Sequence, residues 1–126
     1  MLAHKDAMAT VAVKSIPVAR RFYEEVLGLP HVAGDGQGWI AFKAGNTQLF
    51  VYQSQFAGTN QATSVTWVLG DDFDAVVEAL HKKGVVFEHY DNMPNTTRQG
   101  DIHISGDMKV AWFKDPDGNI LNIGNG

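Results

Sequence analysis

The sequence predicts an α+β protein made of two tandem βαβββ modules, residues 1–58 and 62–126. Three observations lead to this fold class. Two segments have the apolar spacing of amphipathic helices, strand-forming runs flank each of them, and this order of elements occurs twice along the chain. A chain of 126 residues is long enough for one domain or for two small modules that share a core.

Each module contains one predicted amphipathic helix. The first, Pro17–Leu27, can be capped by Ser15 and stopped by Gly28. The second, Asp72–Lys83, has acidic residues at its start and lysines at its end, as the helix dipole favours. The apolar stripe of the first helix consists of Ala19, Phe22, Tyr23, Val26 and Leu27.

The predicted strands are rich in Val, Ile, Phe, Trp and Thr and are bounded by Gly, Asn and Asp. They are Met8–Lys14, Gly38–Lys43, Thr47–Gln53, Ser64–Leu69, Val85–His89, Lys109–Lys114 and Asn119–Ile123, with a further short strand at His31–Ala33. The polar segment Asp91–Asp107 is too long for a tight hairpin. Two interpretations of this segment stay open, a flap over a cleft and a surface loop.

The repeat is visible in the residues themselves. A shift of 56 positions places Met8 on Ser64. Further along, Phe42–Asn46 matches Phe113–Asn119, with two residues inserted in the second copy. Paired helices and paired hairpins at parallel offsets favour a duplication over two unrelated α+β halves.

Composition and charge narrow the classes of function. The chain has no cysteine, which excludes disulfides, thiolate metal sites and a cysteine nucleophile. The net charge is −4, and the ten lysines and arginines are scattered, so no basic surface for nucleic acid is expected. Residues 1–7 lack the apolar core of a signal peptide, and no apolar run has the length of a membrane span. We therefore expect a cytoplasmic protein.

Three stretches resemble the vicinal-oxygen-chelate superfamily, which includes glyoxalases, bleomycin resistance proteins and dioxygenases. Val11–Leu29 is similar to the family's first strand and helix with its "FY…LG" pattern, Trp112–Asn119 resembles its closing "DPDGN" hairpin, and Asp71–Ala75 is similar to the start of its second helix. The resemblance covers nearly the whole chain. It implies two curved modules whose concave faces enclose a cleft, and a homodimer, because two-module members of the family usually pair.

Strand alternation predicts which side chains face away from the helices. In Thr47–Gln53 these are Gln48, Phe50 and Tyr52, and Trp112 is placed on the same kind of face. Such a mixture of aromatic, hydroxyl, amide and thioether groups is typical of a concave binding surface. Packing between modules or subunits is the alternative. The candidate ligand-binding residues are Met8, Phe50, Tyr52, Ser64, Thr66, Trp112, Asn122 and His103.

The resemblance also implies where a metal would bind. Metal-dependent relatives use His and Glu at four positions, which fall here on Met8, Phe50, Ser64 and Asn122. These side chains do not suit a hard divalent ion, and neither do their immediate neighbours in the sequence. We therefore expect no metal and no other cofactor, which speaks against glyoxalase-type isomerisation and extradiol ring cleavage. Asp101 and His103 would share a face if extended, but a surface or flap role for them is preferred over metal binding.

Two hypotheses of function follow. The first is a binder of a small, partly aromatic organic molecule, similar to the resistance-type members of the family. In it, Phe50, Tyr52 and either Trp67 or Trp112 are stacking walls, and Asn122 is a polar anchor. The second is a lyase, isomerase or dioxygenase acting on a dicarbonyl, a diol or a glutathione adduct. It would need a metal or metal-free acid–base chemistry. A structural or partner-binding role is a third option.

Overall fold

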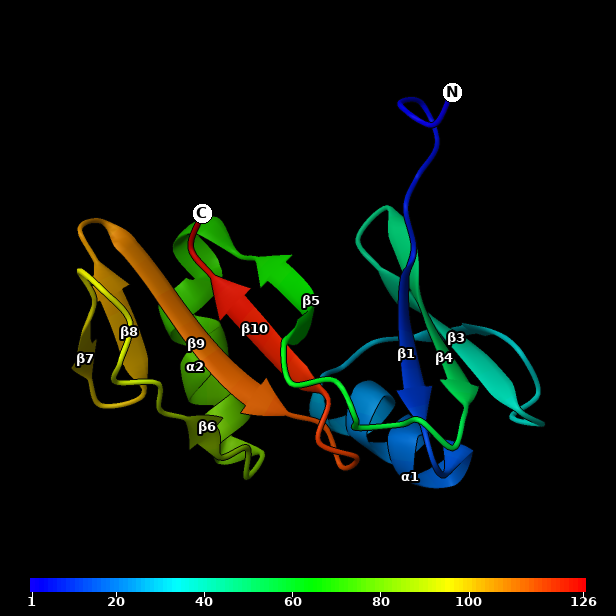
Figure 1. Cartoon of the computed structure of the whole chain (residues 1–126). Coiled ribbons are helices and arrows are strands. Elements are labelled where there is room, and N and C mark those ends of the chain that lie inside the picture. The colour runs from blue at the N-terminus through cyan, green and yellow to red at the C-terminus, as the bar shows by residue number, and fades with distance from the viewer. The chain divides into compact units, whose positions relative to one another are not determined.

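The computed structural model describes residues 1–126, which form two compact units (Figure 1). The first unit comprises Met1–Asn60 and Pro116–Asn119, and the second comprises Gln61–Asp115 and Ile120–Gly126. The turn 116–119 connects the last two strands of the second unit but makes its contacts within the first. No helix is both long and apolar enough to cross a membrane.

The first unit is a four-stranded sheet with one helical segment. Its strands are β1 (Ala9–Val13), β2 (His31–Ala33), β3 (Trp39–Ala44) and β4 (Thr47–Gln53), in the order β1-β4-β3-β2. β1 and β4 are parallel, and the other neighbours are antiparallel. The helical segment begins as α1 (Ile16–Arg20) and continues as a π-helical turn, η1 (Arg21–Val26).

The predicted first helix is therefore present, but its second half is wound more widely than an α-helix. The predicted cap is confirmed, because the Ser15 hydroxyl accepts a hydrogen bond from the Val18 N–H. This segment buries Tyr23 completely against the sheet, where its ring centroid lies 6.0 Å from that of Phe42. The core also contains alternate residues of β1 and β4, namely Val11, Val13, Leu49 and Val51, together with the consecutive β3 residues Ile40, Ala41 and Phe42.

The second unit contains the same pattern with an additional hairpin. Its strands are β5 (Thr63–Val68), β6 (Phe87–Glu88), β7 (Thr97–Gln99), β8 (Ile102–Ser105), β9 (Met108–Lys114) and β10 (Ile120–Gly124). The order is β5-β10-β9-β8-β7, and β6 also pairs with β9. A 3₁₀ turn, η2 (Gly70–Asp72), leads into α2 (Phe73–Lys82), which buries Phe73, Val77 and Leu80.

The two sheets share one connectivity, which confirms the predicted βαβββ order. β1 is parallel to β4 as β5 is to β10, and β3 is antiparallel to β4 as β9 is to β10. Equivalent pairs occupy the parallel seam of each sheet, with Thr10 opposite Phe50 in the first and Thr66 opposite Asn122 in the second. Phe50 and Asn122 are thus equivalent positions of the two modules.

The sequence predicts no strand in Asp91–Asp107, but the structure has two there. This segment contains β7 and β8, which form a hairpin, and β8 pairs with the edge of β9. The sequence gives little indication of this hairpin, because β7 is short and wholly exposed and therefore has no apolar alternation. The preceding strand, β6, is shorter than the predicted Val85–His89.

Candidate functional site

An aromatic ladder lies on the face of the first sheet that points away from α1. It consists of Trp39, Phe50 and Tyr52. The ring centroids of Trp39 and Phe50 are 5.3 Å apart, those of Phe50 and Tyr52 are 6.2 Å apart, and both ring pairs are stacked. Trp39 is 40% exposed and Tyr52 is 38% exposed. Large rings with near-parallel planes and open edges form a platform on which a planar group can stack.

The ladder results directly from strand pairing. Trp39 pairs with Tyr52 across the β3–β4 hairpin, so the two rings share a face. Phe50 lies two residues before Tyr52 on the same strand and therefore on that same face. The intervening residues Leu49 and Val51 are buried towards the helix. The predicted alternation of this strand is thus what the structure has.

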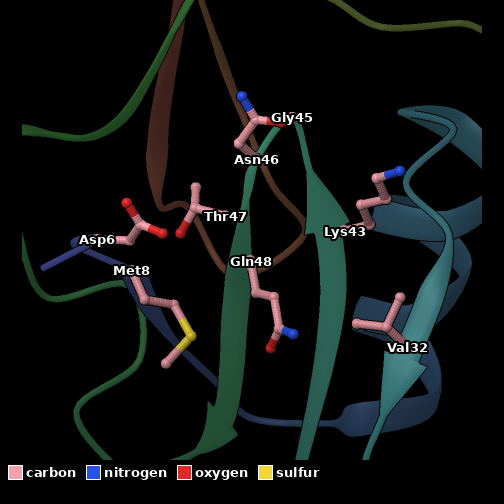
Figure 2. Close-up of a pocket in the computed structure, with 8 residues that line it drawn as sticks. All are labelled: Asp6, Met8, Val32, Lys43, Gly45, Asn46, Thr47 and Gln48. Atoms are coloured by element: carbon pink, nitrogen blue, oxygen red, sulfur yellow. The ribbon is translucent and has the colours of Figure 1, made fainter.

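A pocket of about 570 Å³ lies at the hairpin end of the first sheet (Figure 2). Figure 2 shows Asp6, Met8 and Thr47 on one side of β4 and Lys43 and Val32 on the other. The Thr47 hydroxyl donates a hydrogen bond of 2.9 Å to the backbone carbonyl of Ala7, which holds the N-terminal segment against the sheet. The remaining lining residues are Gly45, Asn46 and Gln48.

The pocket and the ladder belong to one surface. Gln48 lines the pocket and lies two residues before Phe50, so both side chains are on the same face of β4. Lys43 pairs with Gln48 in the neighbouring strand. The open face of the first sheet therefore changes from aromatic at one end to amide and charged groups at the other, an arrangement suited to a molecule with a planar ring and a polar end.

The open face of the second sheet carries a different group, the Tyr90 cluster, which consists of Tyr90, His103 and Trp112. The ring centroids lie 6.1 Å apart for Tyr90 and His103, 5.3 Å for Tyr90 and Trp112, and 4.9 Å for His103 and Trp112. The Trp112 indole N–H donates a hydrogen bond of 3.1 Å to the Thr63 hydroxyl. Asn122 adjoins the cluster, because it pairs with Trp112 across β9 and β10.

His103 is only 2% exposed, and one hydrogen bond sets its tautomer. The backbone N–H of Tyr90 donates to Nε2 of His103 at 2.9 Å, so in the neutral ring the proton resides on Nδ1. Burial lowers the pKa of His103, and the Val110 backbone opposes this shift in part. Burial, followed by the charge of Glu88, raises the pKa of Tyr90. Both side chains are therefore held in their neutral forms near pH 7.

Three buried polar atoms of the second unit have no partner in hydrogen-bonding geometry. They are Oη of Tyr90, Nδ1 of His103 and Oδ1 of Asn122. Buried polar groups in folded proteins are almost always paired, so an unpaired one indicates strain, a functional role or a missing partner. All three atoms belong to the Tyr90 cluster or to the residue beside it.

The structure distributes the predicted site residues over both units. Met8, Phe50 and Tyr52 lie in the first, and Trp112, Asn122 and His103 come together in the second. Ser64 and Thr66 are exposed on β5, where Thr66 pairs with Asn122.

The expectation that His103 has a surface or flap role is wrong, because it packs in the Tyr90 cluster. Asp101 is not part of the Tyr90 cluster that contains His103. Its carboxylate contacts Nε2 of His81 at 2.6 Å and Nε2 of His89 at 2.7 Å. Asp101 precedes β8, so the assumed alternation from Asp101 to His103 does not apply.

Two residues of these surfaces are absent from the sequence-based prediction. Trp39 was missed because its position opposite Tyr52 depends on the hairpin register, which parity within one strand does not give. Tyr90 lies just beyond the predicted end of its strand. Strand parity gave no signal for it, because β6 ends at Glu88.

The positions that hold a metal in some relatives do not fit one here. Phe50 has no donor atom and is stacked between Trp39 and Tyr52. The equivalent Asn122 offers a neutral amide, and Met8 and Ser64 offer a thioether and a hydroxyl. No group of three or more His, Cys, Asp or Glu side chains is arranged to hold a metal ion.

Comparison with known families agrees with this geometry. Residues 6–123 match the family described as the glyoxalase/bleomycin resistance protein/dioxygenase superfamily. The match spans most of the chain, and the two βαβββ units are the architecture that the resemblance implied. The protein therefore belongs to this superfamily. No curated protein is significantly similar to it in sequence.

Solved structures share its fold at low sequence identity. A lactoylglutathione lyase from Agrobacterium tumefaciens superposes with a TM-score of 0.72 at 18% identity, covering 98% of this chain and 95% of that one. The fosfomycin resistance protein of Mesorhizobium loti gives a TM-score of 0.69 at 17% identity, covering 100% and 94%. A glyoxalase/bleomycin resistance protein/dioxygenase from Alicyclobacillus acidocaldarius gives 0.72 at 15% identity, covering 96% and 90%. At these identities the likeness establishes the fold alone.

Proposed function

We propose that this protein binds a small organic molecule whose planar group stacks on the aromatic ladder of the first sheet. The observation that carries the proposal is the stacked series Trp39, Phe50 and Tyr52, whose two outer rings are exposed. Exposed rings of this size on one sheet face are costly to leave in water, and they gain stacking energy when a planar ligand covers them.

The pocket beside the ladder supports a ligand with two unlike ends. Lys43, Asn46 and Gln48 provide an ammonium group and two amides at the hairpin end. A carboxylate or hydroxyl on the ligand would find donors there while its ring lies on Phe50. The proposed ligand is therefore a planar molecule that carries an acidic or hydrogen-bonding substituent.

The proposal places the protein with binders that hold a molecule without metal-dependent turnover. The four metal-ligand positions carry unsuitable side chains, which supports this choice. A lyase, isomerase or dioxygenase activity is the alternative. The observation that favours it is the buried, neutral His103, whose Nδ1 has no partner. From the family resemblance we further propose that the protein is a homodimer and that it is cytoplasmic.

The three tryptophans of the chain provide a direct test. Trp39 is in the ladder, Trp112 is in the Tyr90 cluster, and Trp67 pairs with Ile123 on the helix-facing side of the second sheet. In protein labelled with 5-fluorotryptophan, each ring gives its own ¹⁹F resonance. Titration with 2-naphthoate should shift the Trp39 resonance to saturation and leave that of Trp67 in place.

Cyclohexylacetate is the matched probe, since it has the same charge but no planar ring. It should bind the ladder at least about tenfold more weakly, given a stacking contribution of about 1–3 kcal/mol. Equal binding of both probes, or shifts of all three resonances alike, would show that the ladder is not a stacking platform.

A further inference from the structure

Two hydrogen-bond donors of the second unit are closed to solvent and have no partner in good hydrogen-bonding geometry, although the Val110 backbone lies close enough to His103 to oppose in part the burial that lowers its pKa. They are the Nδ1–H of His103 and the hydroxyl of Tyr90. The two side chains contact each other and both contact Trp112, so the donors belong to one cluster and are not scattered exceptions. Because buried donors are nearly always satisfied, their partner is expected to come from outside the protein.

The kind of partner follows from the chemistry of the two groups. Nε2 of His103 already accepts the Tyr90 N–H, so the ring can only donate through Nδ1. Burial keeps the imidazole uncharged and keeps the proton on the Tyr90 hydroxyl, as the directions of both pKa shifts indicate. Two neutral donors within one cluster match an oxygen that accepts hydrogen bonds.

The charges around the cluster favour a neutral oxygen over a carboxylate. The cations nearby are already engaged, since Arg98 pairs with Asp91 at 2.7 Å and Lys114 pairs with Glu88 at 3.1 Å. A carboxylate placed on the donors would lose its hydration without gaining a counter-ion, which is strongly unfavourable. A carbonyl oxygen carries no such cost.

We infer that Tyr90 and His103 form a second binding site, which takes the carbonyl oxygen of a neutral amide or ketone whose attached ring packs on Trp112. The Tyr90 side chain is partly exposed although its hydroxyl is not. Because both donors are closed to solvent, the inference requires this ring to move aside when a ligand binds. The site lies entirely in the second unit, and it does not depend on the ladder of the first.

Three probes of similar size separate the contributions. Benzamide has a neutral carbonyl, benzoate has an anionic carboxylate, and toluene has no acceptor. In fluorotryptophan-labelled protein, benzamide should shift the Trp112 resonance to saturation. Benzoate and toluene should bind at this position at least about tenfold more weakly. The Trp39 resonance reports on the ladder in the same spectrum, so failure of one site is distinguishable from failure of the other.

Tyr90→Phe is the decisive variant. It removes only an atom that has no partner in the free protein and keeps the ring contacts with His103 and Trp112, so it should fold as well as the wild type. Its affinity for benzamide should fall about fivefold to tenfold, the usual contribution of one hydrogen bond. Thr97→Val, which removes an exposed hydroxyl on β7 of the same unit, is the control and should leave benzamide binding at Trp112 unchanged.

A second readout follows His103 itself. In ¹⁵N-histidine-labelled protein, the side-chain shifts should show the Nδ1–H tautomer, and benzamide should move the Nδ1 resonance. An Nε2–H tautomer, equal binding of benzamide and benzoate, or unchanged affinity in Tyr90→Phe would each overturn the inference. A site filled by a resident water would also overturn it, because benzamide would then leave the Trp112 resonance where it is.

Discussion

The side-chain amide of Asn119 donates a hydrogen bond of 2.8 Å to the backbone carbonyl of Ala12, 107 positions earlier in the chain. Asn119 is buried, and Asp117 of the same turn accepts a hydrogen bond from the Lys14 N–H at 3.3 Å. The "DPDGN" motif is therefore more than a tight turn between β9 and β10. Although it lies near the end of the sequence, this turn hydrogen-bonds to β1 and so stabilises the first unit.

Replacing this amide should lower the stability of the fold. Asn119→Ala removes a buried hydrogen bond, and we expect a loss of about 1–3 kcal/mol in the free energy of unfolding, measured by urea denaturation. Asn46→Ala, at an exposed hairpin position, is the matched control and should change stability by no more than about 0.5 kcal/mol. Equal effects of both changes would show that the bond to Ala12 contributes nothing.

Two tyrosines of the first unit should respond in opposite ways to truncation. Tyr52 lies in the ladder, so Tyr52→Ala should weaken binding of 2-naphthoate by about 1–3 kcal/mol with little loss of stability. Tyr23 is fully buried, so Tyr23→Ala should cost about 3–5 kcal/mol of folding free energy. A denaturant melt and a titration on each variant provide the comparison. A large loss of stability in Tyr52→Ala with unchanged affinity would show that Tyr52 is a core residue and does not bind the ligand.

The buried His103 should make the protein less stable in mild acid. Burial lowers its pKa, the charges of Arg98 and His89 act in the same direction, and the Val110 backbone and Asp91 oppose them. A histidine with a lowered folded-state pKa binds fewer protons than in the unfolded chain. Stability is therefore present above the unfolded value of 6.5 and is lost as the pH falls from there towards the folded value.

The measurement is the free energy of unfolding of the wild type and of His103→Gln between pH 7.5 and about pH 5. Groups distant from His103 titrate in both proteins alike, so the difference between the two curves reports on His103 and on the charges that it interacts with, such as Asp91. The wild type should lose more stability over this interval than the variant. Parallel curves would mean that His103 titrates as it does in the unfolded chain.

Chelators should leave the melting temperature unchanged. Metal bound only to the native state would add RT ln(1 + [L]/Kd), about 2.7 kcal/mol at a hundredfold excess over Kd. The side chains at Met8, Phe50, Ser64 and Asn122 predict that no such contribution exists. Plasma mass spectrometry of the purified protein should accordingly find no stoichiometric divalent ion. A clear fall of the melting temperature in EDTA would contradict this donor chemistry.

The proposed homodimer has a simple check. Sedimentation velocity at micromolar concentration should give a species of twice the chain mass of 13.8 kDa. A single species at the mass of one chain would remove the dimer from the proposal. The ladder variant Tyr52→Ala, run in parallel, shows whether the open face of the first sheet takes part in association.

The fold could be predicted because its signals are local. Alternation in β4 separates Leu49 and Val51 from Phe50 and Tyr52 without knowledge of any partner strand. The site was only partly predictable, because Trp39 requires the register of a hairpin and the burial of His103 requires the pairing of β8 with β9. The π-helical turn was missed for a related reason, since over six residues its apolar spacing cannot be told from that of an α-helix.

The β7–β8 hairpin has an evolutionary consequence. Only the second unit has it, and it delivers His103 to a position for which the first sheet has no equivalent strand. Where the second sheet places Trp112 opposite Asn122, the first places Ala41 opposite Phe50. The two units thus share a scaffold but differ in the side chains of their open faces. Under the two proposals, substitutions could adjust the donors of one unit without changing the rings of the other, so one short gene could explore two ligand chemistries at once.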